Sequence, residues 1–253
     1  MDLDFALLFT TTGLFYFVVL SLLEIVLGID NIIFISIITD PLEKVQQRKA
    51  RNIGLALALI IRLILLSVVG WIIGLTEPMY TINGWDVTGQ KLVLLLGGLF
   101  LIYKSTIEMH KNIVGAEEGN QQKKPLKLRA IIIQIILVDI VFSFDSIITA
   151  IGMTNGIAKE TGGNPMIIIY MAVVVSMIVM MVFAKPISNF ISDRPTIKMI
   201  ALAFLVTIGV ILIAESFDQH VPKGYIYFAM VYALFVEMLN LRMKKNQSKG
   251  DSK

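Results

Sequence analysis

Seven apolar runs constrain this chain more than any other feature of its sequence. They cover residues 13–38, 53–75, 91–107, 130–152, 165–185, 198–215 and 224–241. A helix of about 20 apolar residues crosses a bilayer, and within lipid only helices and closed barrels satisfy the backbone hydrogen-bonding groups. With 56% hydrophobic and 16% charged residues, the chain has too little polar surface for a soluble protein of this size. We therefore expect an all-α membrane protein with seven transmembrane helices.

The basic residues predict the orientation of these helices. Most of the 22 lysines and arginines lie on alternate connections, in segments 39–52, 104–129 and 185–198 and after residue 241. The remaining connections contain only Lys91, Lys159 and Lys223, and Arg62 lies within a span. Because cytoplasmic loops are enriched in lysine and arginine, we expect the N-terminus outside and the C-terminus in the cytoplasm.

The connections are too short to hold a second domain. We expect one transmembrane domain, 1–241, followed by a basic cytoplasmic tail, 242–253. The acidic start MDLDF is unlike a secretory signal, so the first span is expected to be retained in the membrane. The polar connection 108–129 is interpreted as a flexible cytoplasmic connector. These features indicate a multi-pass protein of a cell membrane, most simply a prokaryotic plasma membrane.

The first and fourth spans share a sequence motif. EIVLGIDNII at 24–33 aligns without gaps with DIVFSFDSII at 139–148. Lys91 to Glu108 and Lys198 to Glu215 form a weaker echo between the third and sixth spans. The unit contains three spans, so the second copy begins from the opposite side of the membrane. We expect a 3+3 inverted-topology repeat, about 10–108 and 130–216, plus a seventh helix at about 224–241. This arrangement is typical of secondary transporters.

The repeated motif places acids inside apolar runs, at Glu24, Asp30, Asp139 and Asp145. An ionised carboxylate at the bilayer centre costs about 2.5–3.5 kcal/mol on insertion scales. A polar network that only joins helices could use serine, threonine or asparagine without that charge. We therefore expect a cation to compensate the acids. Without a cation, the site is expected to take up protons, which suggests proton–metal exchange.

The spacing of the acids affects how they can meet. Residues six apart on a continuous helix differ by about 240° around its axis, so each pair would face two directions. We predict unwound helix near Gly28-Ile29-Asp30 and Ser143-Phe144-Asp145, which would free carbonyl groups to bind an ion. Arg62 is expected to pair with the acidic cluster, although a separate structural ion pair is the alternative.

The candidate ligands all offer oxygen. Besides the four carboxylates they include the Asn31 amide and the Ser146 hydroxyl, which favour Mn²⁺, Ca²⁺ or Mg²⁺ over soft metal ions. The chain contains no cysteine and only two histidines, His110 and His220, which excludes thiolate and histidine-rich metal sites. The 13 methionines are scattered through the spans and are interpreted as packing residues. Glu215, near the end of a span, is expected to reach the membrane interface.

The two acidic motifs, together with GGLFLIYKSTIEMH at 97–110, resemble those of the TerC family of integral membrane proteins, within the LysE-type transporter superfamily. The resemblance covers residues 10 to about 241. It implies seven spans built on an inverted repeat, manganese export or homeostasis, and an association with tellurite resistance. It also implies a metal site that uses Glu24, Asp30, Asn31, Asp139 and Asp145. Tellurite resistance is interpreted as indirect, because an acidic pocket repels an oxyanion.

The leading hypothesis is therefore a divalent-cation exporter, with Mn²⁺ favoured and Ca²⁺ possible, that carries its metal as cargo and holds no permanent cofactor. Its expected partners are the lipid bilayer, the metal ion and protons, whereas protein partners are unknown. One alternative is a membrane scaffold that delivers metal to, or assembles with, other membrane or secreted proteins. Another is an exporter of organic solutes, for which Arg62 is the available cationic partner. The sequence shows no enzyme motif and no nucleic-acid platform.

Overall fold

The computed structural model describes residues 5–68, 73–74, 76–82, 85–114, 128–161 and 164–250. In these residues seven helices are long and apolar enough to cross a membrane. They are α1 (Thr11–Thr39), α2 (Lys44–Ser67), α4 (Gly89–Val114), α5 (Leu128–Thr161), α6 (Met166–Ser192), α7 (Pro195–Ser216) and α8 (Lys223–Gly250). A short 3-10 helix, η1 (Phe5–Phe9), precedes α1. The expected helical membrane protein with seven spans is confirmed.

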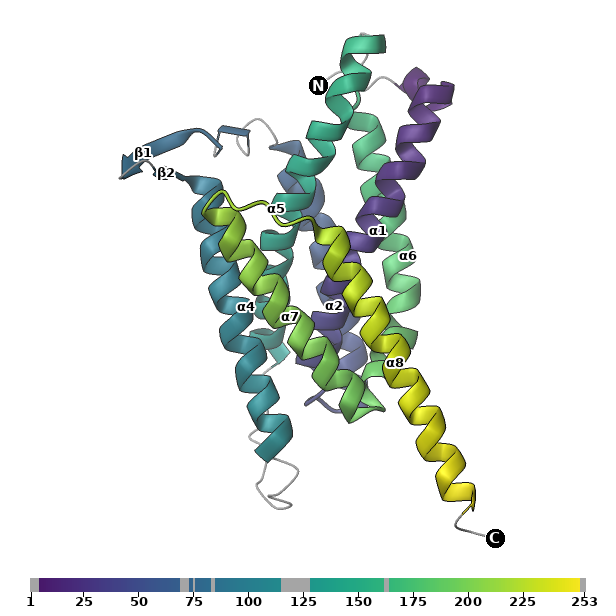
Figure 1. Ribbon diagram of the computed structural model, residues 1–253. Helices are drawn as coiled ribbons and strands as arrows, with labels where there is room; N and C mark the ends of the chain where they lie inside the picture. The colour runs from purple at the N-terminus through teal and green to yellow at the C-terminus, as the bar shows by residue number, and fades with distance from the viewer. Residues whose placement is uncertain are drawn as a thin grey trace.

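Consecutive helices run in opposite directions, so the two ends of the chain lie at opposite ends of the bundle (Figure 1). One end carries two antiparallel strands, β1 (Pro78–Ile82) and β2 (Trp85–Thr88), and is called the hairpin end. The other is called the C-terminal end. The basic connections between α1 and α2 and between α6 and α7 lie at the C-terminal end, as the charge pattern predicts. The orientation of the bundle in the bilayer stays a prediction.

Local sequence explains where several helices begin. The Thr10 hydroxyl accepts a hydrogen bond from the Gly13 backbone N–H at 3.0 Å and caps α1. Pro195 opens α7, where its missing N–H has no intrahelical partner to lose. Helix α2 begins at Lys44, well before the apolar run that predicted it, because the polar residues 44–52 continue the same helix. Helix boundaries read from hydropathy alone miss such polar extensions.

Some expectations need correction. The strands β1 and β2 depart from the all-α expectation; they flank Asn83-Gly84 in the sequence, a dipeptide typical of hairpins. The predicted connector 108–129 is shorter than expected, because α4 continues to Val114 and α5 begins at Leu128. Residues 115–127 lie outside the described residues, as do 69–72 and 75 of the second predicted span. The predicted tail is helical as far as Gly250.

The main helix–helix contacts follow the pattern expected of a three-helix repeat. The most extensive contacts join α4 to α7, α1 to α6 and α2 to α5. Exchanging α1 with α5, α2 with α6 and α4 with α7 converts the α1–α6 contact into the α5–α2 contact and leaves the α4–α7 contact in place. Figure 1 shows α4 and α7 side by side, with α8 crossing the bundle beside α7. A three-helix repeat would produce this pattern, and the repeat itself stays a prediction.

Helices α4 and α7 approach each other closely at two glycines. A Cβ on Gly98 would lie 2.5 Å from the Gly209 carbonyl oxygen, and a Cβ on Gly209 would lie 2.8 Å from that of Gly98. Each glycine also faces an isoleucine of the other helix, Ile213 or Ile102. If Gly98 is matched with Gly209, the alignment of α4 with α7 differs by four residues, about one helical turn, from the predicted match of Lys91 with Lys198. In the new register three further pairs match, namely Leu94 with Leu205, Leu101 with Leu212 and Ser105 with Ser216.

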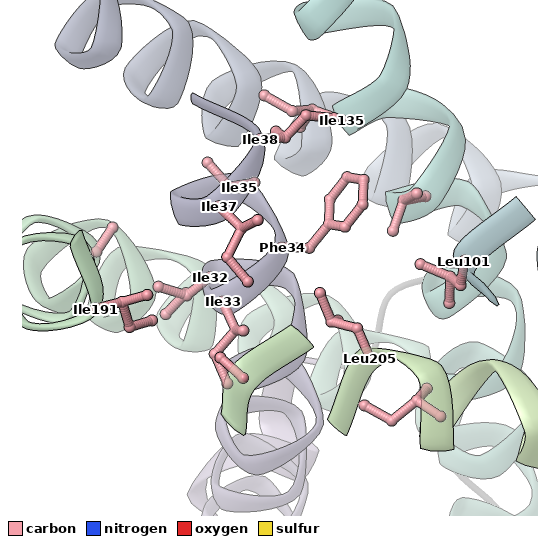
Figure 2. Packing of buried hydrophobic residues seen from close by; sticks show 14 of the residues in the cluster. Ile32, Ile33, Phe34, Ile35, Ile37, Ile38, Leu101, Ile135, Ile191 and Leu205 are labelled. Carbon is pink, nitrogen blue, oxygen red and sulfur yellow. The ribbon is translucent and has the colours of Figure 1, made fainter. Parts of the chain in front are cut away.

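The C-terminal half of α1 lies in the largest apolar cluster. Every residue from Asp30 to Thr39 is buried. Figure 2 shows its isoleucines and Phe34 filling the space beside α1, with Leu101, Ile135, Ile191 and Leu205 contributed by neighbouring helices. The part of this cluster that surrounds Ile32–Ile38 is called the apolar plug. It begins immediately after the second acid of the first motif, so it separates the acidic motif from the C-terminal end of the bundle.

Candidate ion site

The predicted unwinding of the acidic motifs is wrong. Helix α1 is continuous through Gly28-Ile29-Asp30, and α5 is continuous through Ser143-Phe144-Asp145. A continuous helix keeps every backbone hydrogen bond inside the segment, which is the favourable arrangement in lipid. The two acids of each motif therefore face different directions. As a result the four acids sort into two groups, each with one acid from α1 and one from α5.

The first group is a buried ion triad formed by Glu24, Arg62 and Asp139. Arg62 Nη1 donates to Glu24 Oε2 at 2.7 Å, and Arg62 Nε lies 3.6 Å from Asp139 Oδ1. All three side chains are almost completely buried. Because a buried charge is tolerated when it is paired and hydrogen-bonded, one arginine from α2 can hold an acid from α1 and an acid from α5 together.

Two polar side chains complete the ion triad. Asn31 Nδ2 donates to Asp139 Oδ1 at 3.0 Å, and the Ser143 hydroxyl donates to Asp139 Oδ2 at 3.3 Å. Ser143 Oγ also accepts from Arg62 Nε at 2.9 Å. Asn31 is therefore committed to Asp139 in this structure. Glu24 Oε1 is the buried oxygen of the triad without a hydrogen-bond partner among the described residues.

The second group lines a small, partly open space, called the ion cavity. Asp30 and Asp145, the second acids of the two motifs, line a cavity of about 30 Å³ together with Ser146 and Arg62. This volume suits a water molecule or a small ion. Tyr227 of α8 donates to Asp30 Oδ2 at 3.1 Å, whereas the buried Asp30 Oδ1 has no hydrogen-bond partner in the described part of the chain. Asp30 therefore brings to the cavity a carboxylate with one oxygen that no described residue hydrogen-bonds.

A lysine from α8 contacts the second acid of the cavity. Lys223 Nζ donates to Asp145 Oδ2 and lies 3.7 Å from Glu215 Oε1. Glu215 thus faces Lys223 and also lines the vestibule; whether it reaches the membrane interface stays a prediction. Sequence reasoning assigned Lys223 to a connection and did not single out Tyr227. The available signal was spacing, because Lys223 and Tyr227 stand four apart at the start of the last apolar run and therefore share one helix face.

A wide vestibule leads to the cavity from the hairpin end. It has a volume of about 530 Å³ and is lined by polar residues that include Asp145, Glu215, Asp218, His220 and Lys223. Asp218 forms its rim, with φ 62° just after the end of α7, and pairs with Lys91 at 2.7 Å. Asp145 and Lys223 line both the vestibule and the ion cavity. They form the boundary between the two spaces.

The opposite side of the cavity is closed. The apolar plug covers it, and the nearby space lined by Phe34, Lys104, Ser105 and Glu108 measures about 10 Å³, too little for a hydrated ion. The residue that follows the ten-residue acidic motif is Phe34 in the first copy and Thr149 in the second. Phe34 belongs to the apolar plug, whereas Thr149 lines the open vestibule. The two ends of the bundle therefore differ in access to the acids.

All the predicted site residues lie in this region, but they do not converge on one point. Glu24 and Asp139 belong to the ion triad and Asn31 donates to Asp139, whereas Asp30, Asp145 and Ser146 line the ion cavity. In the described part of the chain no three His, Asp or Glu side chains stand close enough to hold one metal ion. A cation in the cavity would therefore take two carboxylates and complete its shell with hydroxyl groups and water, as Mg²⁺ often does. The metal-binding roles of these residues stay predictions.

Comparison with known proteins identifies the family. Residues 9–252 match the family described as "Integral membrane protein TerC family". The chain belongs to the TerC family. It is 49% identical over 228 residues to the UPF0053 inner membrane protein YgdQ of Escherichia coli strain K12, covering 90% of this chain and 92% of that protein. A UPF0053 protein of Haemophilus influenzae is 47% identical over 229 residues, covering 90% and 93% respectively.

A second Escherichia coli relative is longer than this chain. The UPF0053 inner membrane protein YoaE is 40% identical over 228 residues, which cover 90% of this chain and 42% of that protein. No solved structure matches the chain significantly. Family membership, relatives named as inner membrane proteins and the seven candidate spans together identify this TerC-family chain as a multi-pass inner membrane protein.

Proposed function

We propose that this TerC-family chain transports divalent cations, with Mn²⁺ as the favoured cargo, and that the ion cavity between Asp30 and Asp145 is its binding site. The observation that supports this proposal is Asp30, a buried acid that lines the cavity and whose Oδ1 has no hydrogen-bond partner in the described residues. A carboxylate inside a membrane protein needs compensation, and a cation supplies it.

The chemistry of the cavity supports a hard cation. Its polar lining comes from two carboxylates and from the hydroxyls of Ser146 and Tyr227, alongside the cations Arg62 and Lys223. Hard divalent ions such as Mn²⁺, Ca²⁺ and Mg²⁺ prefer such oxygen donors. The cavity of about 30 Å³ suits an ion better than an organic solute, which argues against the solute-exporter alternative. The resemblance to the TerC family is what favours Mn²⁺ among these ions.

The positions of the two spaces support a route for export. The vestibule connects Asp145 with the hairpin end, which the charge pattern predicts to be outside. The apolar plug separates Asp30 from the predicted cytoplasmic side. We interpret this as a conformation that releases its ion outward. A second conformation, with the plug opened and the vestibule closed, would load the ion, as inverted-repeat transporters do.

Flux of Mn²⁺ into proteoliposomes that contain a Mn²⁺-quenched dye tests the proposal. We expect Asp30→Asn and Asp145→Asn to reduce flux by about tenfold or more, because losing an oriented charged ligand costs at least that in metal affinity. Asp218→Asn is the matched control, because its carboxylate is 64% exposed at the vestibule rim; we expect flux within about twofold of wild type. Equal flux in all four proteins would contradict the site.

Protons are the proposed exchanging ion. When the metal leaves, the acids of the cavity still need compensation inside the membrane, and proton uptake would supply it. An imposed pH gradient should therefore change the rate of Mn²⁺ flux by the wild-type protein, whereas flux that ignores the gradient would contradict proton exchange. In cells, we expect loss of the protein to raise manganese content and lower manganese tolerance. Absence of flux together with a stoichiometric protein partner would instead favour the scaffold alternative.

A further inference from the structure

Lys223 stands where a cation would meet Asp145. Its ammonium group donates to Asp145 Oδ2 and lies 3.7 Å from Glu215, so one positive charge sits between two carboxylates. It also lines both the vestibule and the ion cavity. An ion that moves between these two spaces therefore passes the lysine, and both cations would use the same carboxylate.

The position of Lys223 on its helix indicates a role beyond stability. Lys223 is the first residue of α8, and the positive end of the helix dipole disfavours a basic residue there. Four residues later on the same helix, Tyr227 donates to Asp30. One turn of α8, the helix outside the predicted repeat, thus contacts the matching acid of both motifs. The two acids come from the predicted repeat, whereas the two side chains that contact them come from α8, which has no equivalent helix within that repeat.

The position of Lys223 allows its ammonium group to move between Asp145 and the vestibule. Its side chain is 28% exposed through the vestibule, and a lysine carries its charge on a flexible four-carbon stem. Helix α8 packs mainly against α7, and its large apolar residues Phe228, Val231 and Phe235 are exposed on its surface. The ammonium group can therefore leave Asp145 for the vestibule without rearrangement of the buried helices.

We propose that Lys223 is a tethered competing cation that excludes a divalent ion from Asp145 and, by returning to Asp145, drives release of the ion into the vestibule. This inference rests on the proposed transport of divalent cations through the ion cavity. Like charges at one carboxylate repel each other, so each cation weakens binding of the other. Removing the lysine charge should then strengthen ion binding and slow turnover, the opposite of what losing a ligand does.

Binding of Mn²⁺ to the purified full chain, measured through the electron paramagnetic resonance signal of free Mn²⁺, tests this. We expect Lys223→Met to lower the Kd for Mn²⁺ about tenfold, because it removes a full charge in contact with the ligand. Lys91→Met is the matched control; it removes a lysine at the same end that pairs with Asp218, 2.7 Å away. We expect its Kd to stay within about twofold of wild type.

A chemical switch separates the charge of Lys223 from any effect on folding. The chain has no cysteine, so Lys223→Cys supplies a unique thiol in a protein folded before modification. Treatment with 2-aminoethyl methanethiosulfonate restores a tethered ammonium group, whereas methyl methanethiosulfonate adds a neutral group. We expect the first adduct to return the Kd to the wild-type value and the second to retain tight binding.

The outcomes distinguish this inference from the proposed function. If wild type binds Mn²⁺ and Asp30→Asn does not, but the two adducts bind equally, the role of Lys223 is wrong while the cavity site stands. Weaker binding in Lys223→Met and in the neutral adduct would also overturn it, because the lysine would then only hold the site together. If wild type binds no Mn²⁺, the proposed function fails and the competing role fails with it.

Discussion

The ion triad and the ion cavity are built from the same repeated motif, yet their surroundings are opposite. The first acids of the two motifs pair with Arg62 in the ion triad, whereas the second acids line a cavity, and Asp145 also lines the open vestibule. A spacing of six on two continuous helices creates this separation, because it turns the two acids of each motif to different faces. One motif can therefore supply both a rigid internal brace and a site for a mobile cation.

The triad also marks where the two halves differ. Ser143 of α5 accepts a hydrogen bond from Arg62 of α2, and Gly28, its partner in the motif alignment, packs against the thioether of Met180 in α6. Thus α2 presents a guanidinium group where α6 presents an apolar side chain. A single arginine serves both halves. Its ion pairs are with the first acids, although its side chain also lines the ion cavity beside the second acids.

Loss of Arg62 should have the largest effect on the protein. Arg62→Met would leave Glu24 and Asp139 as buried acids without a cation, and breaking a buried ion pair costs about 3–5 kcal/mol. Chemical unfolding in detergent micelles measures the change in the free energy of unfolding. As a control, Lys198→Met removes a pair with Asp40 at 2.6 Å near a helix end. Lys198 itself is buried, but the Asp40 side chain left behind is 24% exposed and water can compensate its charge, so we expect a change of about 1 kcal/mol or less.

A rescue variant tests whether charge is the cause. Adding Glu24→Gln and Asp139→Asn to Arg62→Met removes both uncompensated acids, and we expect it to recover most of the lost stability. Equal effects of Arg62→Met and Lys198→Met would show that the ion triad is no brace. In that case the first acids would no longer differ from the second acids in their contribution to stability.

The next prediction compares one acid from each group. Glu24→Gln removes the charge that accepts from Arg62 at 2.7 Å, and a hydrogen bond to a charged partner is worth about 1.5–3 kcal/mol. Asp30→Asn removes a charge whose hydrogen bond comes from a neutral donor, the Tyr227 hydroxyl, so we expect a change within about 1 kcal/mol. The same unfolding assay ranks them, and the reverse order would show that the cavity is the braced group.

The smallest effect should come from Tyr227. Tyr227→Phe deletes the hydroxyl that donates to Asp30 at 3.1 Å, and a hydrogen bond typically contributes about 1 kcal/mol. Tyr232→Phe, in the exposed part of the same helix, is the matched control and should leave stability unchanged in the same assay. A loss for Tyr227→Phe as large as that of Arg62→Met would make α8 part of the brace, and so contradict the separation of the two groups.

The sequence predicted the features that depend on long-range averages. Apolar runs revealed seven helices, and the charge pattern placed the basic connections at one end, because the bilayer acts on each whole span. Which group each acid joins depends instead on local backbone structure, namely whether α1 is continuous or unwound at Gly28. The helix is continuous there, which keeps its backbone groups hydrogen-bonded in lipid. The alignment of α4 with α7 was also predicted one turn off. The prediction matched the charged residues at the ends of the two spans, whereas the observed contact depends on the close approach of the backbones at Gly98 and Gly209.

The residues that complete the cavity were harder to find from the sequence. Lys223 and Tyr227 belong to a helix outside the predicted repeat, so comparing the two motifs gave no reason to examine them. Their role depends on where α8 lies in space, which hydropathy does not determine. Two features of the sequence indicated them: Lys223 is a basic residue at the start of an apolar run, and Tyr227, four residues later, lies on the same helix face.

The apolar plug has an electrical consequence. Aqueous solution reaches Asp145 through the vestibule, whereas the stretch Ile32–Ile38 is sealed by side chains, so most of a transmembrane voltage would fall across it. That stretch is about two helical turns, roughly 10 Å, in length. Moving a doubly charged ion through 100 mV takes about 4.6 kcal/mol, and here that work would be concentrated within this short segment. The plug thus acts as the dielectric of a thin capacitor, with the acids of the cavity at one of its plates.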